Sequence, residues 1–383
     1  MPNTFHRDRL TWLAYLLLAL YAYFLNILGP ITPFLKSEFN LSYTVSSLHF
    51  TAFAAGVLIV GLAGHLLIQR IGRWRAAWIG SFGMSLGALF LILGKTPVIT
   101  VGGCLLMGMV GSLILAIVPA TLSEKHGELR AVAFSESNVI ASMFSAVAPL
   151  LVGWFAGLVV GWRLAIGLAA LAPILMYISF RNASSPAASA AHTPQSSDQP
   201  PLPLLYWVYW LAIVLAVSAE FCMIFWSADY LETVLGMQKA GAAQAVSLFL
   251  GGMIIGRLAS SRLVQRFTVS HVVTGSILLA GLGFLVYWQG GSAFLGMLGL
   301  FVTGLGIASL YPLTLSLSME AARGNTVQAS ARATLASGAA MLVLPLVLGR
   351  LADKIGIASA YGMVAVLLGC LLLIILGAGK YRS

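Results

Sequence analysis

Twelve long apolar runs restrict what this chain can fold into. Each run holds roughly 18–25 residues, the length with which an α-helix crosses about 30 Å of hydrocarbon. Backbone polar groups in lipid must be satisfied internally, so we expect each run to be a membrane-spanning helix. The runs cover residues 10–31, 45–68, 76–94, 97–121, 130–154 and 161–180 in the first half, and 204–228, 241–264, 270–288, 292–317, 326–349 and 357–379 in the second.

The composition predicts an all-α membrane protein. The 383 residues are 60% hydrophobic and 8% charged, and the mean hydropathy is +0.96. Soluble domains carry about 25% charged residues. The net charge of +10 is spread over short loops, which argues against nucleic-acid binding. The first apolar run has no small-residue cleavage site, so we expect it to be retained as a span and not removed as a signal peptide.

The second half of the sequence repeats the first at a constant offset of 196 positions (265 − 69). A parallel repeat of this kind predicts two homologous six-helix bundles related by an axis along the membrane normal. The matches that chance explains least are Gln69-Arg70 with Gln265-Arg266, Glu124 with Glu320, Pro149 with Pro345 and Gly153 with Gly349.

The stretch 181–203 separates the two repeats. It is short of large apolar residues and rich in Ser, Ala, Pro and Gln, which is typical of a solvated linker. We therefore expect an N-terminal bundle over residues 1–180, a linker over 181–203 and a C-terminal bundle over 204–383. An even number of spans puts both termini and the linker on one side. The loops of that side carry the excess of Lys and Arg, which predicts that it is the cytoplasmic side of the inner membrane.

The loop after the second run reads Leu67-Ile68-Gln69-Arg70-Ile71-Gly72-Arg73-Trp74-Arg75. It is similar to Gly-x-Leu-Ala-Asp-Arg-x-Gly-Arg-Arg, the signature of the major facilitator superfamily. The resemblance covers the whole chain and implies the fold of that superfamily, with Arg70 and Arg73 in cytoplasmic gating. Gln69 stands where the family has Asp. The charged latch of the family is therefore either missing here or replaced by neutral hydrogen bonds.

A carboxylate stands within the seventh run. A charge inside a membrane span is costly, so Glu220 marks a functional site. It can bind and release a proton, and Trp226, six positions on, can stack on a sugar or attract an organic cation. The alternative is a Glu satisfied by a neighbouring helix.

The pattern Ala219-Glu220-x5-Trp226, together with Gly-Met-Ile-Ile-Gly-Arg at 252–257, resembles the fucose-permease-related branch of the superfamily. That resemblance implies proton-coupled transport of a sugar or another small polar solute.

Three further charges call for an explanation. In the resembled fold the fifth and eighth spans face each other, which implies a gating ion pair between Glu136 and Arg257. Alternatively, Arg257 extends its guanidinium to the membrane interface. Arg332 aligns with Glu136 in the repeat, and it either pairs with a carboxylate or binds an anionic substrate.

The first run offers polar side chains for a binding site. Tyr23 and Asn26 recur at roughly helical spacing, and we expect both to line the site with Glu220. A structural role is the alternative for Asn26. Pro30 and Pro312 are expected to kink their runs.

Motifs of other function classes are absent from the sequence. There is no P-loop, no Gly-x-Ser-x-Gly with partners and no metal-binding spacing, so we expect neither an enzyme nor a bound cofactor or metal.

The best hypothesis is a monomeric secondary active transporter that couples protons to uptake of a sugar or small polar metabolite by alternating access. The alternative is a proton-driven exporter of amphiphilic drugs or metabolites. The loops are too short for the signalling domain of a receptor. Expected partners are the small-molecule substrate, protons and the lipid bilayer.

Overall fold

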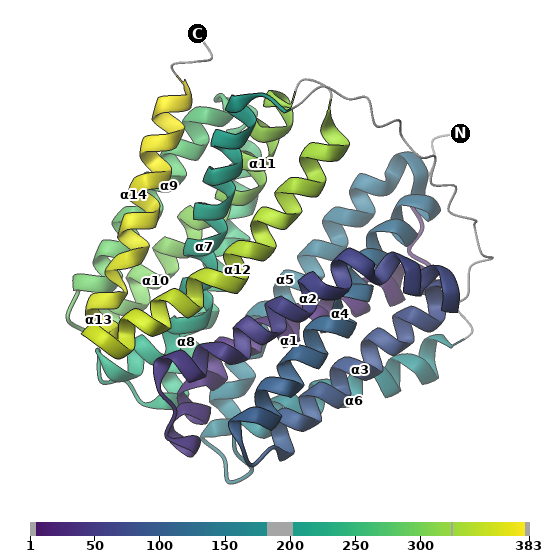
Figure 1. The fold of residues 1–383 in the computed structure, drawn as a ribbon, viewed down its shortest axis with the longest axis horizontal. Helices are drawn as coiled ribbons and strands as arrows, with labels where there is room; N and C mark the ends of the chain where they lie inside the picture. The colour runs from purple at the N-terminus through teal and green to yellow at the C-terminus, as the bar shows by residue number, and fades with distance from the viewer. Residues whose placement is uncertain (1–4, 182–201, 323–324, 380–383) are drawn as a thin grey trace. The chain divides into compact units, whose positions relative to one another are not determined.

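A computed structural model describes residues 5–181, 202–322 and 325–379. Every regular element in these ranges is a helix (Figure 1), so the expectation of an all-α protein is confirmed for them. Most of the predicted linker, residues 182–201, lies outside the described ranges.

Each of the twelve apolar runs falls on one helix or on a consecutive pair. In the first half these are α1 (Arg9–Phe39), α2 (Tyr43–Ile71), α3 (Arg73–Leu93), α4 (Pro97–His126), the 3-10 turn η1 (Gly127–Leu129), α5 (Arg130–Ala156) and α6 (Arg163–Phe180). In the second half they are α7 (Leu204–Thr233), α8 (Lys239–Leu263), α9 (Val269–Gln289), α10 (Ala293–Ile307), α11 (Leu310–Ala321), α12 (Thr326–Ile355), α13 (Ile357–Ala360) and α14 (Gly362–Gly379).

Eleven helical segments of the described ranges are long and apolar enough to cross a membrane. One of them, Pro97–Ala156, has 60 residues and contains both α4 and α5. At 1.5 Å per residue it would extend about 90 Å, roughly three times the thickness of the hydrocarbon core. It is therefore too long for a single crossing. The arrangement of twelve spans in two six-helix bundles stays a prediction.

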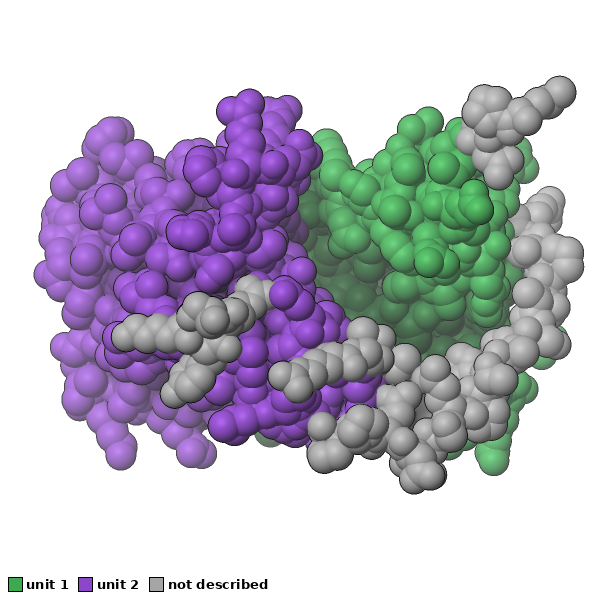
Figure 2. Space-filling model, turned by 90° about the horizontal axis from the view of Figure 1, so that it is seen from above, with its two compact units in different colours: residues 1–28, 52–195 green, residues 29–51, 196–383 purple. Residues whose placement is uncertain are grey.

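Packing divides the chain into two compact units (Figure 2). Unit 1 consists of residues 1–28 and 52–195, and unit 2 of residues 29–51 and 196–383. Unit 2 therefore includes the end of α1 and the start of α2, which belong to the first repeat by sequence. The predicted bundle boundaries at 180 and 204 stay a prediction.

The internal repeat is visible in how helices cross within each unit. In unit 1 a side chain on Gly108 of α4 would collide with the carbonyl oxygen of Phe53 on α2. In unit 2 a side chain on Gly304 of α10 would collide with the carbonyl oxygen of Phe249 on α8. Both members of the second pair lie 196 positions after those of the first (304 − 108 and 249 − 53). The two halves thus use the same glycine at the same close helix crossing.

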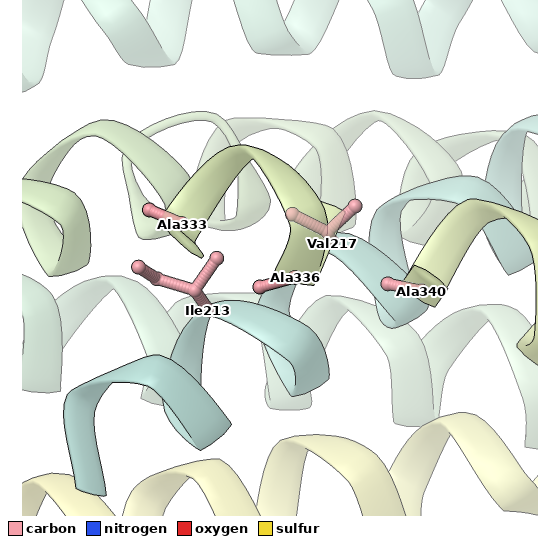
Figure 3. Close-up of a cluster of buried hydrophobic side chains, with 5 residues drawn as sticks. All are labelled: Ile213, Val217, Ala333, Ala336 and Ala340. Atoms are coloured by element: carbon pink, nitrogen blue, oxygen red, sulfur yellow. The ribbon is translucent and has the colours of Figure 1, made fainter. Parts of the chain in front are cut away.

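Helix α7 is central to unit 2. It packs against α8, α11, α12 and α14, and most of its second half is buried. Small side chains on α12 let it approach α7 closely, and this packing holds the helix that carries Glu220. Figure 3 shows the contact, which consists of Ile213 and Val217 on α7 and Ala333, Ala336 and Ala340 on α12.

The tenth run is interrupted close to Pro312, as the sequence predicts. Helix α10 ends at Ile307 and α11 begins at Leu310. A proline ring clashes with the carbonyl group four positions earlier, here that of Ala308, and proline has no N–H to donate. Helix α1 continues through Pro30 and Pro33 as one helix, and the kink expected at Pro30 stays a prediction.

Candidate functional site

Glu220 lies close to the midpoint of α7 and is half-buried. The guanidinium of Arg257 on α8 attracts its carboxylate electrostatically. Both residues belong to unit 2, and the charge of one predicted gating residue acts on the predicted proton site. The helix around Glu220 is apolar and long enough to cross a membrane. A carboxylate with a cation nearby is the kind of intramembrane group that marks an ion or substrate pathway.

Trp226 is completely enclosed within unit 2. Its side chain has 0% exposure, and its indole Nε1 donates a hydrogen bond to the carbonyl oxygen of Pro345 on α12 at 3.0 Å. The ring packs beside Tyr43, with centroids 5.7 Å apart. In this conformation the indole is a packing element, and a solute could stack on it only after a rearrangement. Its role in solute binding stays a prediction.

The two predicted site residues of α1 are occupied by hydrogen bonds inside unit 1. The hydroxyl of Tyr23 donates to the carbonyl oxygen of Ala165 on α6 at 2.8 Å. The Nδ2 of Asn26 donates to Ser145 Oγ on α5 at 3.0 Å and to the carbonyl oxygen of Ala22 at 2.8 Å. Both side chains are buried, so here they fasten α1 to its neighbours. Contact with a solute stays a prediction for each.

Glu136 on α5 is held by the N-terminal part of the chain. Arg7 donates from Nε to Oε2 at 2.8 Å and from Nη2 to Oε1 at 2.5 Å, and the hydroxyl of Tyr15 donates to Oε2 at 3.1 Å. The sequence does not predict this pair, because Arg7 lies 129 positions from Glu136. The predicted pair of Glu136 with Arg257 would join the two units and stays a prediction.

A second ion pair lies next to the first one. Asp8 pairs with Lys125 at the end of α4, and its Oδ1 accepts hydrogen bonds from the backbone N–H (3.0 Å) and the hydroxyl (2.8 Å) of Thr11 in the first turn of α1. Partial burial alone would raise the pKa of Asp8, but the hydrogen bonds from Lys125 and Thr11 outweigh it and lower this pKa below its ordinary value. Asp8 therefore caps α1 as a carboxylate.

The basic loop between α2 and α3 makes a charged contact within unit 1. Arg73 donates from Nη1 to Oε2 of Glu124 at 2.5 Å and from Nη2 to Oε1 at 2.8 Å, the bidentate geometry that Arg favours with carboxylates. Arg70 is exposed in the last turn of α2. Although Gln69 stands where the family has Asp, the loop still forms an ion pair, between Arg73 and Glu124. The gating roles of Arg70 and Arg73 stay predictions.

Arg332 is exposed on α12, within two turns of its start. Its guanidinium carbon lies 5.3 Å from the ring centroid of Trp207, within the range of a cation–π interaction. Trp210 donates from Nε1 to the backbone oxygen of Arg332 at 2.9 Å. Arg332 therefore has an aromatic ring as its partner in place of a carboxylate. Binding of an anionic substrate by Arg332 stays a prediction.

Among residues 5–181, 202–322 and 325–379, no group of three or more His, Cys, Asp or Glu side chains is arranged to hold a metal ion. The candidate site consists of Glu220 and Arg257, with the enclosed Trp226 six residues further along α7.

The helices, the repeated glycine crossing and an intramembrane carboxylate define a polytopic membrane protein of the kind that moves solutes. A family model described as the Major Facilitator Superfamily matches residues 14–339. The chain belongs to this superfamily, as its basic loop and internal repeat suggest.

Named relatives from bacteria share part or most of the chain. A glucose/galactose transporter of Brucella abortus is 25% identical over 360 residues, which cover 86% of this chain and 84% of that protein. A TsgA homolog of Serratia proteamaculans is 23% identical over 278 residues, 71% of this chain and 70% of the relative. An uncharacterized MFS-type transporter of Yersinia pestis is 29% identical over 168 residues, which span only 43% of its length and 42% of this chain.

Solved structures share the fold. A bacterial homolog of the human lysosomal transporter Spinster, in an inward-facing and occupied conformation, aligns with a TM-score of 0.86 at 12% identity. The nucleoside transporter NupG aligns with a TM-score of 0.71 at 14% identity. Each alignment covers 98% of both chains. At these identities the likeness shows the fold and nothing of the solute.

Proposed function

We propose that this protein is a proton-coupled secondary transporter that takes up a hexose or a similarly small polar solute by alternating access. It would work as a monomer in the inner membrane, with both termini in the cytoplasm. Membership in the superfamily supports transport as such. The relative named a glucose/galactose transporter, which matches over most of both chains, supports a sugar as the solute.

The observation that carries proton coupling is the position of Glu220. It stands at the middle of an apolar helix, where an ionised group that served only packing would be costly. Its carboxylate is attracted by Arg257 on the neighbouring helix. The pair gives unit 2 a group that can change its charge without leaving the membrane.

The chemistry of the coupling follows from that pair. As a carboxylate, Glu220 balances the charge of Arg257. When it takes up a proton, its attraction to Arg257 is lost. One protonation event thus changes both the charge inside the membrane and the electrostatic contact between α7 and α8. A transporter can use such a change to select between two conformations.

Ligand stabilisation of the purified protein tests the solute class. A ligand at about 100 times its Kd adds about 2.7 kcal/mol to the stability of the state that binds it. We expect glucose or galactose to raise the unfolding temperature of the wild type and of Glu232→Gln, a control at the outer end of α7. Weak stabilisation by several unrelated amphiphiles, with none by sugars, would favour the exporter alternative. Stabilisation by anions only would move the site to Arg332.

A further inference from the structure

Helix α7 begins with a group of aromatic side chains. Tyr206, Trp207 and Trp210 lie within its first two turns, and the ring of Trp207 contacts the other two, with centroids 5.5 and 5.9 Å apart. Trp207 is exposed, and so are Leu204 and Leu211 on the same face of the helix, three positions before it and four after it. Tryptophan and tyrosine concentrate where a membrane span meets the headgroups. This face of α7 therefore matches the boundary between acyl chains and headgroups.

A cation lies against this aromatic group. The guanidinium carbon of Arg332 on α12 is 5.3 Å from the ring centroid of Trp207. Arg332 is exposed and lies within the segment Gln328–Ile355, which is long and apolar enough to cross a membrane. Its backbone is about 6 Å from the start of that segment, at 1.5 Å per residue. From this depth a long arginine side chain can extend along the apolar surface to the headgroups.

The charge of Arg332 calls for an anion. A cation within a span is costly unless an anion compensates it. In the part of the chain that the structure describes, the Arg332 side chain forms no ion pair with a carboxylate, and its contact is the ring of Trp207. An aromatic ring attracts a cation through its quadrupole but carries no net charge. Trp207 therefore orients the guanidinium without neutralising it, and a bound anion would supply the missing charge.

Two hydrogen bonds hold the backbone around Arg332 against α7. The hydroxyl of Tyr206 donates to the carbonyl oxygen of Ala329 at 2.7 Å, and Nε1 of Trp210 donates to the backbone oxygen of Arg332 at 2.9 Å. Neither bond uses the guanidinium, whose N–H groups suit bidentate contact with a phosphate. The start of α7 and the start of α12 thus form a fixed frame that presents one cation at an apolar surface.

We propose that Trp207, Trp210 and Arg332 form a binding site for the phosphate group of an anionic phospholipid. The exposed leucines favour a lipid over a soluble anion. A phospholipid brings acyl chains that cover Leu204 and Leu211, whereas inorganic phosphate would leave them uncovered. The site would anchor the start of α7 to the headgroup layer. It is separate from the solute site proposed around Glu220 and does not depend on which solute is moved.

Fluorescence quenching by lipids with brominated acyl chains tests the site, because bromine quenches tryptophan on close contact. The protein would be placed in nanodiscs of phosphatidylcholine that contain rising fractions of brominated phosphatidylglycerol or brominated phosphatidylcholine. The difference between each protein and its Trp207→Phe version isolates the signal of Trp207. We expect the anionic lipid to reach half-maximal quenching at about one fifth of the mole fraction that the zwitterionic lipid needs, a ratio equivalent to about 1 kcal/mol.

Variants of two arginines separate this site from general attraction of anionic lipid. Arg332→Gln should make the two brominated lipids quench Trp207 equally. Arg332→Lys should keep part of the preference, because it retains the charge but loses the bidentate geometry. Arg262→Gln is the matched control and should keep the full preference, because Arg262 is an exposed arginine in the last turn of α8.

A second measurement uses the unmodified tryptophans. Phosphatidylglycerol, compared with phosphatidylcholine, should raise the unfolding temperature of the wild type and Arg262→Gln more than that of Arg332→Gln. The proposal would be overturned by equal quenching of wild-type Trp207 by both lipids, or by a preference that survives in Arg332→Gln. Loss of the preference in Arg262→Gln would also overturn it. Inorganic phosphate and glycerol phosphate should leave the quenching unchanged. If either soluble anion displaces the lipid at millimolar concentration, the site belongs to a soluble phosphate and the lipid assignment fails.

Discussion

Lys36 and Asp229 form an ion pair whose two ends are unequally buried. Asp229 is completely enclosed, whereas one fifth of the Lys36 side chain is exposed and its ammonium group also contacts the ring of Tyr43. Removing Lys36 and removing Asp229 should therefore lower the free energy of unfolding by different amounts, because an uncompensated charge is most unfavourable where water cannot reach it.

The unequal burial predicts which of two substitutions destabilises the protein more. Lys36→Met leaves the Asp229 carboxylate buried without a cation and should lower the free energy of unfolding by about 3 kcal/mol. Asp229→Asn leaves an ammonium group that can reach water and keeps its aromatic contact, so it should cost about 1 kcal/mol. Chemical unfolding in detergent measures both. Equal costs would show that the burial of Asp229 does not control the pair.

The glycine crossing of α8 and α10 predicts a second contrast. Gly304→Ala forces a methyl group against the Phe249 backbone and should destabilise the protein by about 1–3 kcal/mol. Gly251→Ala, on α8, meets no atom within 4 Å, and the better helix propensity of alanine should make it neutral or slightly stabilising. Thermal unfolding of the two variants compares them. Because the two crossings are related by the internal repeat, Gly108→Ala should destabilise the protein about as much as Gly304→Ala. A Gly108→Ala variant as stable as the wild type would contradict the equivalence of the two crossings.

The helices and the repeat could be predicted because their signals lie along the chain. Hydropathy over roughly twenty residues reports what lipid requires of a span. The break before Pro312 is predictable from the proline itself, which disturbs the helical hydrogen bonds. The paired crossings at Gly108 and Gly304 follow from an offset that sequence alone reveals. These features depend on local chemistry or on a comparison of the chain with itself.

The ion pairs could not be predicted, because each joins residues far apart in the sequence. Arg7 lies 129 positions from Glu136, and nothing in the sequence around either residue indicates the other. A binding role is predicted for Trp226 because an aromatic ring beside a carboxylate can stack on a sugar or attract an organic cation. Its N–H is taken up by Pro345, a contact that depends on how α7 and α12 cross.

Asp8 predicts a small pH dependence of stability. Its pKa is lowered in the folded protein, so its contribution is present above the ordinary aspartate pKa of about 3.9 and is lost as the pH falls through the lowered value. Its side chain is 47% exposed, so screening limits the contribution to about 0.5 kcal/mol. Asp8→Asn can still cap α1, which isolates the effect of the charge.

Unfolding temperatures of the wild type and Asp8→Asn should therefore differ slightly at pH 7 and converge as the pH falls through the lowered pKa of Asp8. High salt should reduce the difference at neutral pH, since exposed pairs are screened. A difference that grows as the solution becomes acidic would contradict the ion pair with Lys125.

The most direct test of the account is hexose uptake by the purified protein in liposomes with an imposed pH gradient. The wild type and the control Glu232→Gln should accumulate labelled glucose or galactose when the gradient is present and should stop when it is collapsed. Glu220→Gln should lose this accumulation but still exchange hexose between liposomes loaded on both sides, because exchange requires no net proton movement. Full gradient-driven accumulation by Glu220→Gln would contradict the assignment of the proton to this carboxylate, and absence of hexose movement in the wild type would contradict the proposed solute.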